Sequence, residues 1–495
     1  MREKMPEHLR ALLVILTLAT LVFAFAKLLA CPLSITNEDY NRRRLIWFGV
    51  TLSAFLSHNF WIFIVLSGLL TFVGAKHEHN KFALYFFLIF TIPMMQARIT
   101  MPVFLFDIHY VRLLSLTILL PALASLKKDS PKFGYHLQDK ILLAYLLLVF
   151  LLSLQSNYTL GNCFRVNVFY AFTDILLPYY IASRSLNTLQ DFRDVLMSIV
   201  VACMVLAAVA VMESGRHWLL YTSLNEALGA TWLYGKYLAR GGFLRALATP
   251  GQAIALGYVI AVAIGSFLYF RKSTSNKITW HLALGLLVAG LLAPFSRGPW
   301  IGAITMLLVF VITGPHAVSN ITKQGILVLF MVAMVAVTPA WDRIVDFLPF
   351  VGTVDAENVE FRENLLFHGI NLVMENPVFG SSYINLEQFR TGEGIIDIVN
   401  TYLIVALKTG LVGFGLFTSF FITICLQIRK GMCRLSNKDD EMYRLGQTLL
   451  GVLVGILLII FTVSSITIIP FIYWSIAGIG LSYIQLVNQR VNRDL

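Results

Sequence analysis

Apolar runs of 18 or more residues recur from one end of this 495-residue sequence to the other. Each run is long enough to cross a hydrocarbon core of about 30 Å as a helix. Hydrophobic residues make up 58% of the chain and charged residues only 13%, whereas a soluble domain is about a quarter charged. We therefore expect an all-α fold, with residues 1–495 forming one polytopic membrane domain of about 12–15 transmembrane helices.

The apolar runs predict where these helices lie. The run at 45–75 is too long for one simple crossing, so we expect it to divide into a short interfacial helix and a span. The predicted helices are near residues 11–30, 45–75, 82–97, 109–126, 139–154, 164–182, 191–212, 250–270, 279–295, 299–313, 323–340, 400–428, 446–464 and 467–487.

The net charge of +11 could indicate a nucleic-acid partner, but the distribution of the charge argues against it. The basic residues form short clusters beside apolar runs, which is the pattern of cytoplasmic loops in membrane proteins. These clusters are Lys127 with Lys128, Arg271 with Lys272, Arg429 with Lys430 and Arg434, and Arg490 with Arg493. The five cysteines show no zinc-ligand spacing.

The basic loops also predict the orientation of the chain. Placing 271–277, 429–444 and the C-terminal tail in the cytoplasm makes the intervening segments alternate consistently. One cluster does not fit, because Arg42–Arg44 falls on the outer side unless the run 45–75 is split. The predicted outward segments are the loop 214–249, the turn 296–299 and the large loop 341–399.

The large outer loop collects much of the acidic charge in the chain. Residues 341–400 hold ten of the 27 acidic residues and only three of the 38 basic ones. Apolar and polar residues alternate with helical spacing between Glu360 and Glu375, so we expect one or two helices within the loop. The rest of the chain is poor in charge, which makes this loop a natural place for polar chemistry.

Four arginines from separate segments are predicted to face outward. A guanidinium is costly in hydrocarbon, by about 2.5–3.5 kcal/mol, and its planar fork suits the oxygens of a pyrophosphate. Each arginine could instead reach the lipid headgroups or pair with an acid of the outer loop. Their convergence from distant segments favours an anionic ligand. They are Arg240, Arg245, Arg297 and Arg362.

Four short motifs occur in a fixed order relative to these segments. They are Arg-Gly-Gly-Phe at 240–243, FSRGPWIGA at 295–303, FRENLLFHGINLVMENPVFG at 361–380 and GEGIIDIVNTYLIVALKTGLVGF at 392–414. In this combination the chain resembles the superfamily of O-antigen ligases and Wzy-type polysaccharide polymerases, and most closely its exopolysaccharide polymerase branch. The motifs cover about residues 240–415.

The resemblance implies a glycosyltransferase on the outer side of the bacterial inner membrane. Its donor would be an undecaprenyl-pyrophosphate-linked oligosaccharide, with neither a nucleotide sugar nor a metal or other cofactor required. The four arginines would bind the pyrophosphate and stabilise it as the leaving group. Besides the lipid-linked glycan and the bilayer, a chain-length regulator is a partner to consider.

One position departs from the pattern of the ligases. They carry a His-Asn pair where the helix after the large loop begins, whereas this chain reads Val399-Asn400. The general base is therefore open among Glu393, Asp397 and His368. Each also has a structural interpretation: Asp397 as a helix cap, Glu393 as a solvated acid and His368 as a structural histidine.

Other residues near the predicted site have two interpretations. Asn400 and Tyr402 could orient a sugar or the start of the helix. Aromatic residues of the loop 214–249 (Trp218, Trp232 and Tyr234) could stack on sugar rings or anchor the chain at the membrane interface.

We expect the chain to polymerise lipid-linked repeat units. A ligase that attaches finished glycan to a terminal acceptor is the alternative within the superfamily, and the missing histidine favours the polymerase. A flippase for lipid-linked oligosaccharide is an alternative of a different class. Transporters usually show internal repeats and polar residues at the bilayer midplane, and the sequence shows no repeat.

Overall fold

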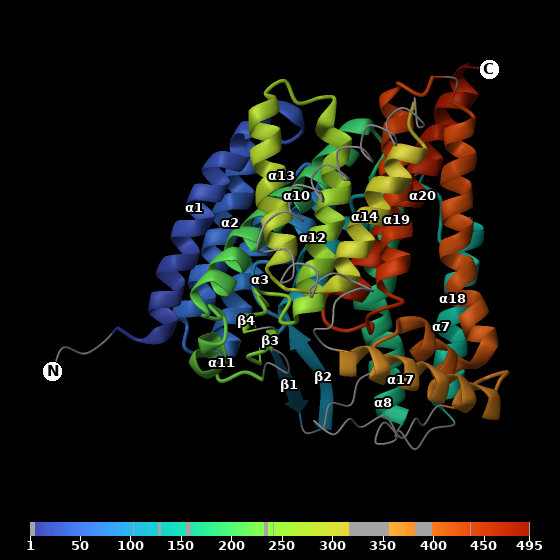
Figure 1. Cartoon of the computed structure of the whole chain (residues 1–495), viewed down its shortest axis with the longest axis horizontal. Helices are drawn as coiled ribbons and strands as arrows, with labels where there is room; N and C mark the ends of the chain where they lie inside the picture. Colours follow the sequence, from blue (N-terminus) through green and yellow to red (C-terminus); the bar gives the residue numbers. More distant parts are fainter. Residues whose placement is uncertain are drawn as a thin grey trace.

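The computed structural model describes residues 5–494, except 102, 127–129, 155–159, 232–235, 241, 316–355, 382–397 and 436. The described part is mostly helical, and its helices stand side by side in one bundle (Figure 1). This confirms the prediction of an all-α polytopic membrane fold. The predicted helix at 323–340 lies outside the described residues.

The N-terminal half contains most of the short elements. Its elements are α1 (Glu7–Leu33), α2 (Asn37–Leu56), α3 (Phe60–Lys76), α4 (Lys81–Leu88), β1 (Gln96–Met101), β2 (Val103–His109), α5 (Tyr110–Leu114), η1 (Ser115–Leu119), α6 (Leu120–Leu123), α7 (Leu137–Ser153), α8 (Leu160–Phe164), η2 (Arg165–Tyr170), η3 (Phe172–Leu176) and α9 (Leu177–Ser185).

The C-terminal half contains most of the long helices. Its elements are α10 (Leu189–Arg216), α11 (Ser223–Leu228), β3 (Ala239–Arg240), β4 (Phe243–Leu244), α12 (Ala253–Phe267), η4 (Leu268–Arg271), α13 (Lys277–Leu292), α14 (Arg297–Ile312), α17 (Ala356–Glu375), α18 (Thr401–Cys433), α19 (Glu441–Ile459) and α20 (Ile469–Asp494).

Six of the described helices are long and apolar enough to cross a membrane: α1, α10, α12 with η4, α18, α19 and α20. Four shorter apolar helices, of 10 to 17 residues, stand among them: α3, the run from α5 to α6, α13 and α14. The total of about 12–15 spans stays a prediction, because residues 316–355 lie outside the described part.

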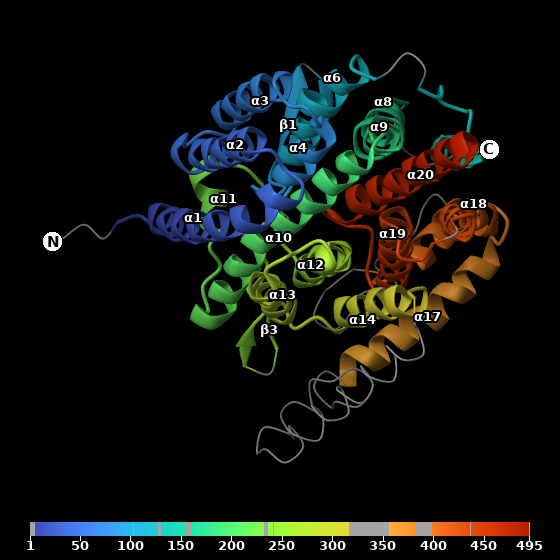
Figure 2. The same ribbon diagram turned by 90° about the horizontal axis from the view of Figure 1, so that it is seen from above.

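The bundle has a clear centre and periphery. The apolar stretch of α12 is 94% buried, whereas the corresponding stretch of α18 is only 33% buried. Seen from above, α10 runs between the N-terminal helices α1–α4 and the C-terminal group of α12, α13 and α19 (Figure 2). The core therefore forms around α10 and α12, and α1 and α18 present their outer faces to the surroundings.

The long run at 45–75 is divided, as predicted, by a turn at residues 57–59. His58 has a φ of 48°, and Asn59 caps α3 by accepting the backbone N–H groups of Trp61 and Ile62. The first piece, α2, is a 20-residue helix, longer than the short interfacial helix expected from the sequence. It begins at Asn37 because the side chain of Thr36 caps it there by accepting the N–H of Asp39.

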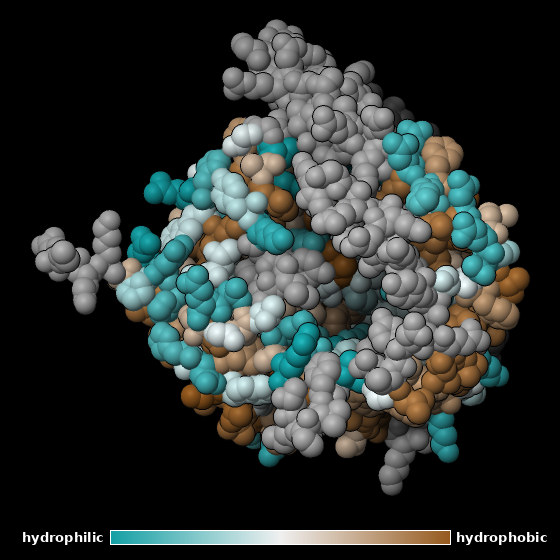
Figure 3. All heavy atoms as spheres, turned by 90° about the horizontal axis from the view of Figure 1, so that it is seen from below, coloured by the Kyte–Doolittle hydropathy of each residue, from teal (hydrophilic) through white to brown (hydrophobic). Residues whose placement is uncertain are grey.

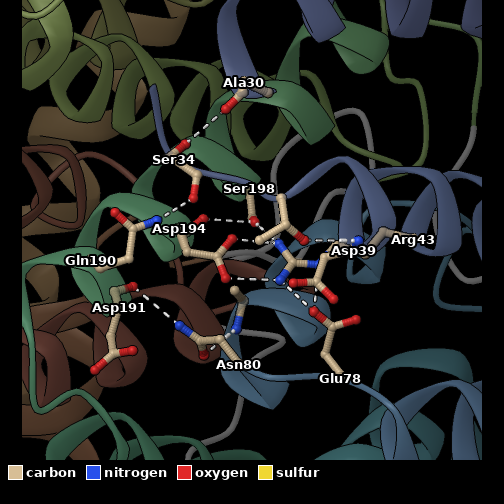
Figure 4. Close-up of polar contacts among 12 residues, drawn as sticks. Ala30, Ser34, Asp39, Arg43, Glu78, Asn80, Gln190, Asp191, Asp194 and Ser198 are labelled. Atoms are coloured by element: carbon tan, nitrogen blue, oxygen red, sulfur yellow. Dashed lines mark hydrogen bonds and ion pairs between the residues drawn. The ribbon is translucent and has the colours of Figure 1, made fainter. Parts of the chain in front are cut away.

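The split resolves the position of the basic cluster at residues 42–44. Arg43 is fully buried between two carboxylates and a hydroxyl, which come from the α3–α4 turn and from α10 (Figure 4). Its Nε donates to Glu78 at 2.9 Å, its Nη1 to Asp194 at 2.6 Å and its Nη1 also to Ser198 at 2.8 Å. The cluster therefore lies at the same end of the bundle as Lys76 and Lys81.

The same end collects the other basic loops, and we call it the basic end. Here Lys272 pairs with Asp439, Arg490 with Asp440, and Arg193 of α10 with Glu441. In Figure 1 the C-terminus and the connection between α12 and α13 lie at this upper end, whereas α11, the β-strands and α17 lie at the opposite end. The two ends thus segregate as the charge pattern predicts.

The predicted helix at 82–97 ends early. α4 stops at Leu88, and the chain then forms an antiparallel hairpin in which Gln96 pairs with His109 and Ile99 with Phe106. Pro93 lies just before β1, where a continuing helix would need its missing N–H. Gln96 also bridges Thr231, so the hairpin joins the loop after α10. This small sheet is a departure from the expected purely helical pattern.

Candidate functional site

The turn between α13 and α14, residues 293–297, is the point on which two of the predicted arginines meet. Nη1 of Arg240 donates to the carbonyl of Phe295 at 2.5 Å. Nε of Arg245 donates to the carbonyl of Pro294 at 3.1 Å, and its Nη2 donates to the hydroxyl of Ser296 at 2.9 Å. We call residues 293–297 with Arg240 and Arg245 the arginine turn.

The β3–β4 hairpin holds the two arginines in place. Arg240 pairs with Phe243 across the hairpin, and Phe243 stacks on Phe295 with ring centroids 5.5 Å apart. Glu213 fixes the chain just beyond, because its buried carboxylate accepts the backbone N–H groups of Leu247 and Ala248 at 2.9 Å. The arginines therefore approach the turn from a braced hairpin.

The arginine turn also forms the N-terminus of α14. Arg297 is the first residue of the helix and is partly exposed. Ser296, the N-cap, makes no side-chain cap hydrogen bond, and its hydroxyl accepts from Arg245 instead. The first N–H groups of a helix have no intrahelical partner and attract anions. Three arginines and a helix N-terminus thus share one turn.

The start of α18 is built by the two residues for which a sugar-binding role was one interpretation. Asn400 caps the helix, because its Oδ1 accepts the N–H of Leu403 at 3.1 Å. The hydroxyl of Tyr402 donates to the carbonyl of Leu457 on α19 at 2.9 Å. Both side chains therefore orient the helix start, which was the other interpretation.

The connection between α19 and α20, residues 460–468, ties these parts together. Thr401 donates from its hydroxyl to the carbonyl of Val463 at 2.7 Å. The hydroxyl of Ser464 donates to the carbonyl of Ile398 at 2.9 Å. On the other side, Gly298 approaches so closely that a Cβ there would lie 2.4 Å from the hydroxyl of Thr462. The loop therefore contacts the starts of both α14 and α18.

The remaining predicted residues lie on α17 or outside the described residues. Arg362 and His368 are exposed on α17, the helix that confirms the expected helical content of the outer loop. α17 packs on α18, and a Cβ at Gly369 would lie 2.6 Å from Leu403. Glu393 and Asp397 lie outside the described residues, as do Trp232 and Tyr234.

Trp218, the described member of the three aromatic residues in the loop 214–249, contacts the N-terminal helix. Its Nε1 donates to Glu7 at 3.0 Å, and the guanidinium of Arg10 lies over its ring at 5.8 Å. The side chain thus braces the start of α1 against the loop that follows α10.

A polar cavity at the same end of the bundle was missed by the sequence analysis. Its volume is about 390 Å³, within the range of ligand pockets. Figure 3 looks onto this end of the bundle, where hydrophilic and hydrophobic residues both reach the surface. The cavity is lined by Met94, Gln96, Asp107, His109, Arg112, Tyr145, Leu146, Val149, Asn167, Tyr170, Ala171, Asp174, Ile175, Thr467, Pro470 and Phe471.

The charged residues of this cavity form a connected network. Arg112 donates to Asp174 from Nε at 3.1 Å and from Nη2 at 2.6 Å. Its guanidinium lies 3.7 Å from the ring centroid of Tyr170. The Tyr170 hydroxyl donates to Oδ2 of Asp107 at 3.1 Å and accepts the backbone N–H of Asp107 at 2.9 Å. One guanidinium therefore organises residues from β2, α5 and the π-helical segments.

His109, at the end of β2, is the histidine of this cavity. Its Nδ1 accepts the backbone N–H of Arg112 at 3.2 Å, which places the proton of the neutral ring on Nε2. Burial, reinforced by the Arg112 guanidinium, holds the pKa of His109 well below its usual range. The ring is therefore neutral at pH 7.

A sequence signal for this cavity did exist. Arg112 and Asp174 stand within apolar runs, at 109–126 and 164–182, and an ionisable residue inside a membrane segment is expensive unless it is paired or functional. Their separation of 62 residues hid the pairing. Among the residues that the structure describes, no group of three or more His, Cys, Asp or Glu side chains is arranged to hold a metal ion.

Part of the chain that contains the turn 293–297 matches a known protein family. Residues 282–418 match the family model for O-antigen ligase. Over this segment the chain is similar to the O-antigen ligase family. The domain match confirms the resemblance seen in the sequence, and it supports a glycosyl-transfer function of the ligase and polymerase type. No curated protein matches the chain.

The segment that matches the O-antigen ligase family contains part of the site. It extends from α13 through the turn 293–297, α14 and α17 into α18. Arg240 and Arg245 lie before this segment in the sequence and contact its turn, and the polar cavity is formed mainly by residues of the N-terminal half. The N-terminal half thus contributes side chains to the same end of the bundle as the matched segment.

Proposed function

We propose that this protein joins undecaprenyl-pyrophosphate-linked oligosaccharide repeat units into a surface or extracellular polysaccharide, at the periplasmic face of the bacterial inner membrane. The observation that carries the proposal is the arginine turn, whose residues 293–297 lie in the segment that matches the O-antigen ligase family. There Arg240 and Arg245, which precede that segment, converge on residues 294–296, directly before Arg297 at the start of α14.

The arginine turn suits the pyrophosphate of the donor. Guanidinium groups and the first N–H groups of α14 are donors that pair with phosphate oxygens. Charge builds up on the pyrophosphate as it leaves, so preorganised donors lower the barrier to transfer. Arg297, the first residue of α14, is the arginine whose position most directly supports this role.

The reaction exchanges one bond for another at the anomeric carbon of the donor glycan. A hydroxyl oxygen of the acceptor repeat unit forms the new glycosidic bond, and the bond from the anomeric carbon to the pyrophosphate oxygen breaks. The electron pair leaves with undecaprenyl pyrophosphate, and the hydroxyl proton passes to a general base. Glu393, Asp397 and His368 remain the proposed candidates for this base. No metal ion is required in this scheme.

The proposal is tested with purified protein and lipid-linked repeat units isolated from the source cell. We expect wild-type protein to produce a ladder of extended glycans on a gel. Arg297→Ala and Arg245→Lys should each reduce the rate about 10²–10³-fold, in line with the loss of one transition-state donor. Lysine retains the charge of Arg245 but cannot bond Pro294 and Ser296 together.

A matched control is available at the opposite end of the bundle. Lys272→Ala removes an exposed basic residue of the basic end, and its rate should equal that of wild type. Arg362→Ala asks separately whether α17 contributes to donor binding. Absence of chain extension by wild-type protein, or full activity of the Arg297 and Arg245 variants, rejects the proposal.

A ligase is the second candidate, favoured by the description of the matching family as O-antigen ligase. A ligase transfers finished glycan to a terminal acceptor, whereas a polymerase transfers the growing chain to another lipid-linked repeat unit. Product analysis separates them: a single glycan joined to an added terminal acceptor, without a ladder, identifies a ligase. The Val399-Asn400 sequence, where the ligases carry His-Asn, supports the polymerase.

A further inference from the structure

The polar cavity contains hydrogen-bonding atoms that the protein leaves unused. Oδ1 of Asp107 and Oγ1 of Thr467 are both buried, and neither has a hydrogen-bond partner among the described residues. The Nε atom of Arg98 lies 3.8 Å from Oδ1, beyond hydrogen-bonding distance. Buried polar atoms without partners are rare and call for an explanation. A ligand with hydroxyl groups would supply both partners.

The charges around the cavity exclude some ligands. The guanidinium of Arg112 is engaged by Asp174 and by the backbone carbonyl of Asp107, and His109 is neutral. The carboxylate of Asp107 forms an ion pair with Arg98 through Oδ1, so the two arginines and two aspartates carry no excess positive charge that would attract a phosphate. An uncharged ligand with hydroxyl donors fits this lining, and the pyrophosphate of a donor does not.

The apolar lining further restricts the class of ligand that fits the cavity. The rings of Tyr145, Tyr170 and Phe471 line the cavity beside the polar atoms. Ligand pockets typically combine such apolar and aromatic walls with a few polar groups that fix orientation. A sugar ring presents hydroxyl groups at its edge and C–H groups on its faces, so it can use both kinds of wall.

One loop connects the cavity with the arginine turn. Thr467, in the connection 460–468, lines the cavity together with Pro470 and Phe471 at the start of α20. Thr462, in the same connection, touches Gly298 in the first turn of α14. The two features therefore lie on either side of a short loop at one end of the bundle, as the two ends of one substrate complex require.

We propose that this cavity binds an uncharged sugar residue of the glycan substrate, with Oδ1 of Asp107 accepting a hydrogen bond from a sugar hydroxyl. Thr467 provides a second hydrogen bond. The inference rests on the proposed function and extends it, because it separates the subsite for sugar from the arginine turn that takes pyrophosphate.

The test measures binding of glycan without its lipid. The probe is the repeat-unit oligosaccharide released from the lipid-linked material by mild acid, titrated into the full-length protein in detergent and followed by calorimetry. We expect saturable binding to wild type and an affinity about tenfold lower for Asp107→Asn, because a charge-assisted hydrogen bond becomes a neutral one. Thr467→Val should weaken binding by a similar or smaller factor.

Two controls keep the result interpretable. Asp439→Asn makes the same chemical change at an exposed position of the basic end and should bind the oligosaccharide as wild type does. Lys272→Ala, the control of the activity assay, should also bind it normally. If Asp107→Asn does not fold, as judged by its thermal transition, Thr467→Val decides the matter.

The outcomes distinguish this inference from the proposed function. Chain extension by wild type with no binding of the released oligosaccharide, or with binding unchanged in Asp107→Asn and Thr467→Val, overturns the cavity inference and leaves the polymerase intact. Oligosaccharide binding that depends on Asp107, without chain extension, supports the cavity and rejects the polymerase. Displacement of bound phospholipid at Asp107, with no effect of oligosaccharide, makes the cavity a lipid site and also overturns the inference.

Discussion

Arg43 and Arg112 are both held by carboxylates, but their surroundings differ in what they leave open. Arg43 is fully buried, with Glu78, Asp194 and Ser198 around its guanidinium. Arg112 lies at the wall of a cavity, and its network ends at a carboxylate oxygen without a hydrogen bond in the described structure. A network whose polar atoms all have partners stabilises the fold, whereas a network with an oxygen that accepts no hydrogen bond can also bind a ligand.

At Arg43 we predict a large loss of stability on truncation. Arg43→Ala leaves Asp194 buried without its cation and leaves Glu78 paired only with Arg42, and breaking a buried pair in this way costs about 3–5 kcal/mol. Unfolding by SDS titration of the purified protein measures the loss. Lys272→Ala is the control: its ion pair with Asp439 joins side chains that are 54% and 63% exposed, so we expect a loss of stability below about 1 kcal/mol. Equal losses for the two variants would contradict this account.

His109 predicts a pH dependence of stability. Its pKa is lowered in the folded protein by burial and by Arg112, so below a pH of about 6.5 the unfolded chain binds a proton that the folded chain does not. The contribution of His109 to the free energy of unfolding is fully present above that pH. It decreases as the pH falls, by at most about 1.4 kcal/mol per pH unit. Thermal unfolding between pH 7.5 and 5 should therefore show a shallower pH dependence for His109→Gln. If stability depends on pH equally in wild type and in His109→Gln, His109 is not the origin of this dependence.

At the scale of elements, α18 consists of two helical pieces joined at Gly410. This residue has a φ of 64° inside the helix, and its Cα faces the backbone of the segment after α17. There Leu411 donates its N–H to the carbonyl of Pro377 at 2.8 Å, and Ser381 donates to the carbonyl of Leu407 at 2.8 Å. These two backbone hydrogen bonds hold the segment after α17 against α18, and we call them the clasp.

Gly410→Ala should open this clasp. A Cβ at Gly410 would lie 2.2 Å from the carbonyl oxygen of Val378, and a positive φ adds strain for alanine, so we expect a loss of about 1–3 kcal/mol. Limited proteolysis should cut faster near residues 376–381. Gly415→Ala is the matched control in the same helix, because nothing lies within 4 Å of its added Cβ. Equal cleavage rates in the two variants would show that the clasp has no such role.

At the scale of the whole molecule, the described loops divide between two ends. The arginine turn, the polar cavity and α17 share one end, and the ion pairs of Lys272, Arg193 and Arg490 lie at the other. The positive-inside rule places the basic end in the cytoplasm. With this orientation, we propose that the arginine turn and the polar cavity face the periplasm.

Cysteine labelling tests this orientation directly. In a background with the exposed Cys433 replaced by serine, we expect a membrane-impermeant maleimide to label Tyr237→Cys in cells with a permeabilised outer membrane. Lys272→Cys should react only after lysis. Both positions are exposed in the structure. Labelling of Lys272→Cys alone in intact cells would invert the orientation and place the arginine turn in the cytoplasm.

The sequence predicted most of the long apolar helices that the structure describes and the end shared by Arg240, Arg245 and Arg297, because apolar length and basic loops are local signals. It did not predict the hairpin at 96–109, in which Gln96 pairs with His109 and also bridges Thr231 far along the chain. The cavity depends likewise on Arg112 meeting Asp174. Asn400 could be placed at a helix start, but its capping bond to Leu403 needed coordinates. Local patterns predict elements, whereas contacts between distant residues build the cavity.

The deep burial of α12 has a consequence for biogenesis. In the finished protein α10 and α12 are shielded from lipid by their neighbours. The ribosome releases the chain N-terminus first, so both helices reach the translocon before α14, α18, α19 and α20 have been synthesised. At that stage each helix must partition into lipid without the later helices that cover it in the finished protein. Their apolar sequences are thus a requirement of insertion, and a polar change that the folded core could accommodate would still fail at the translocon.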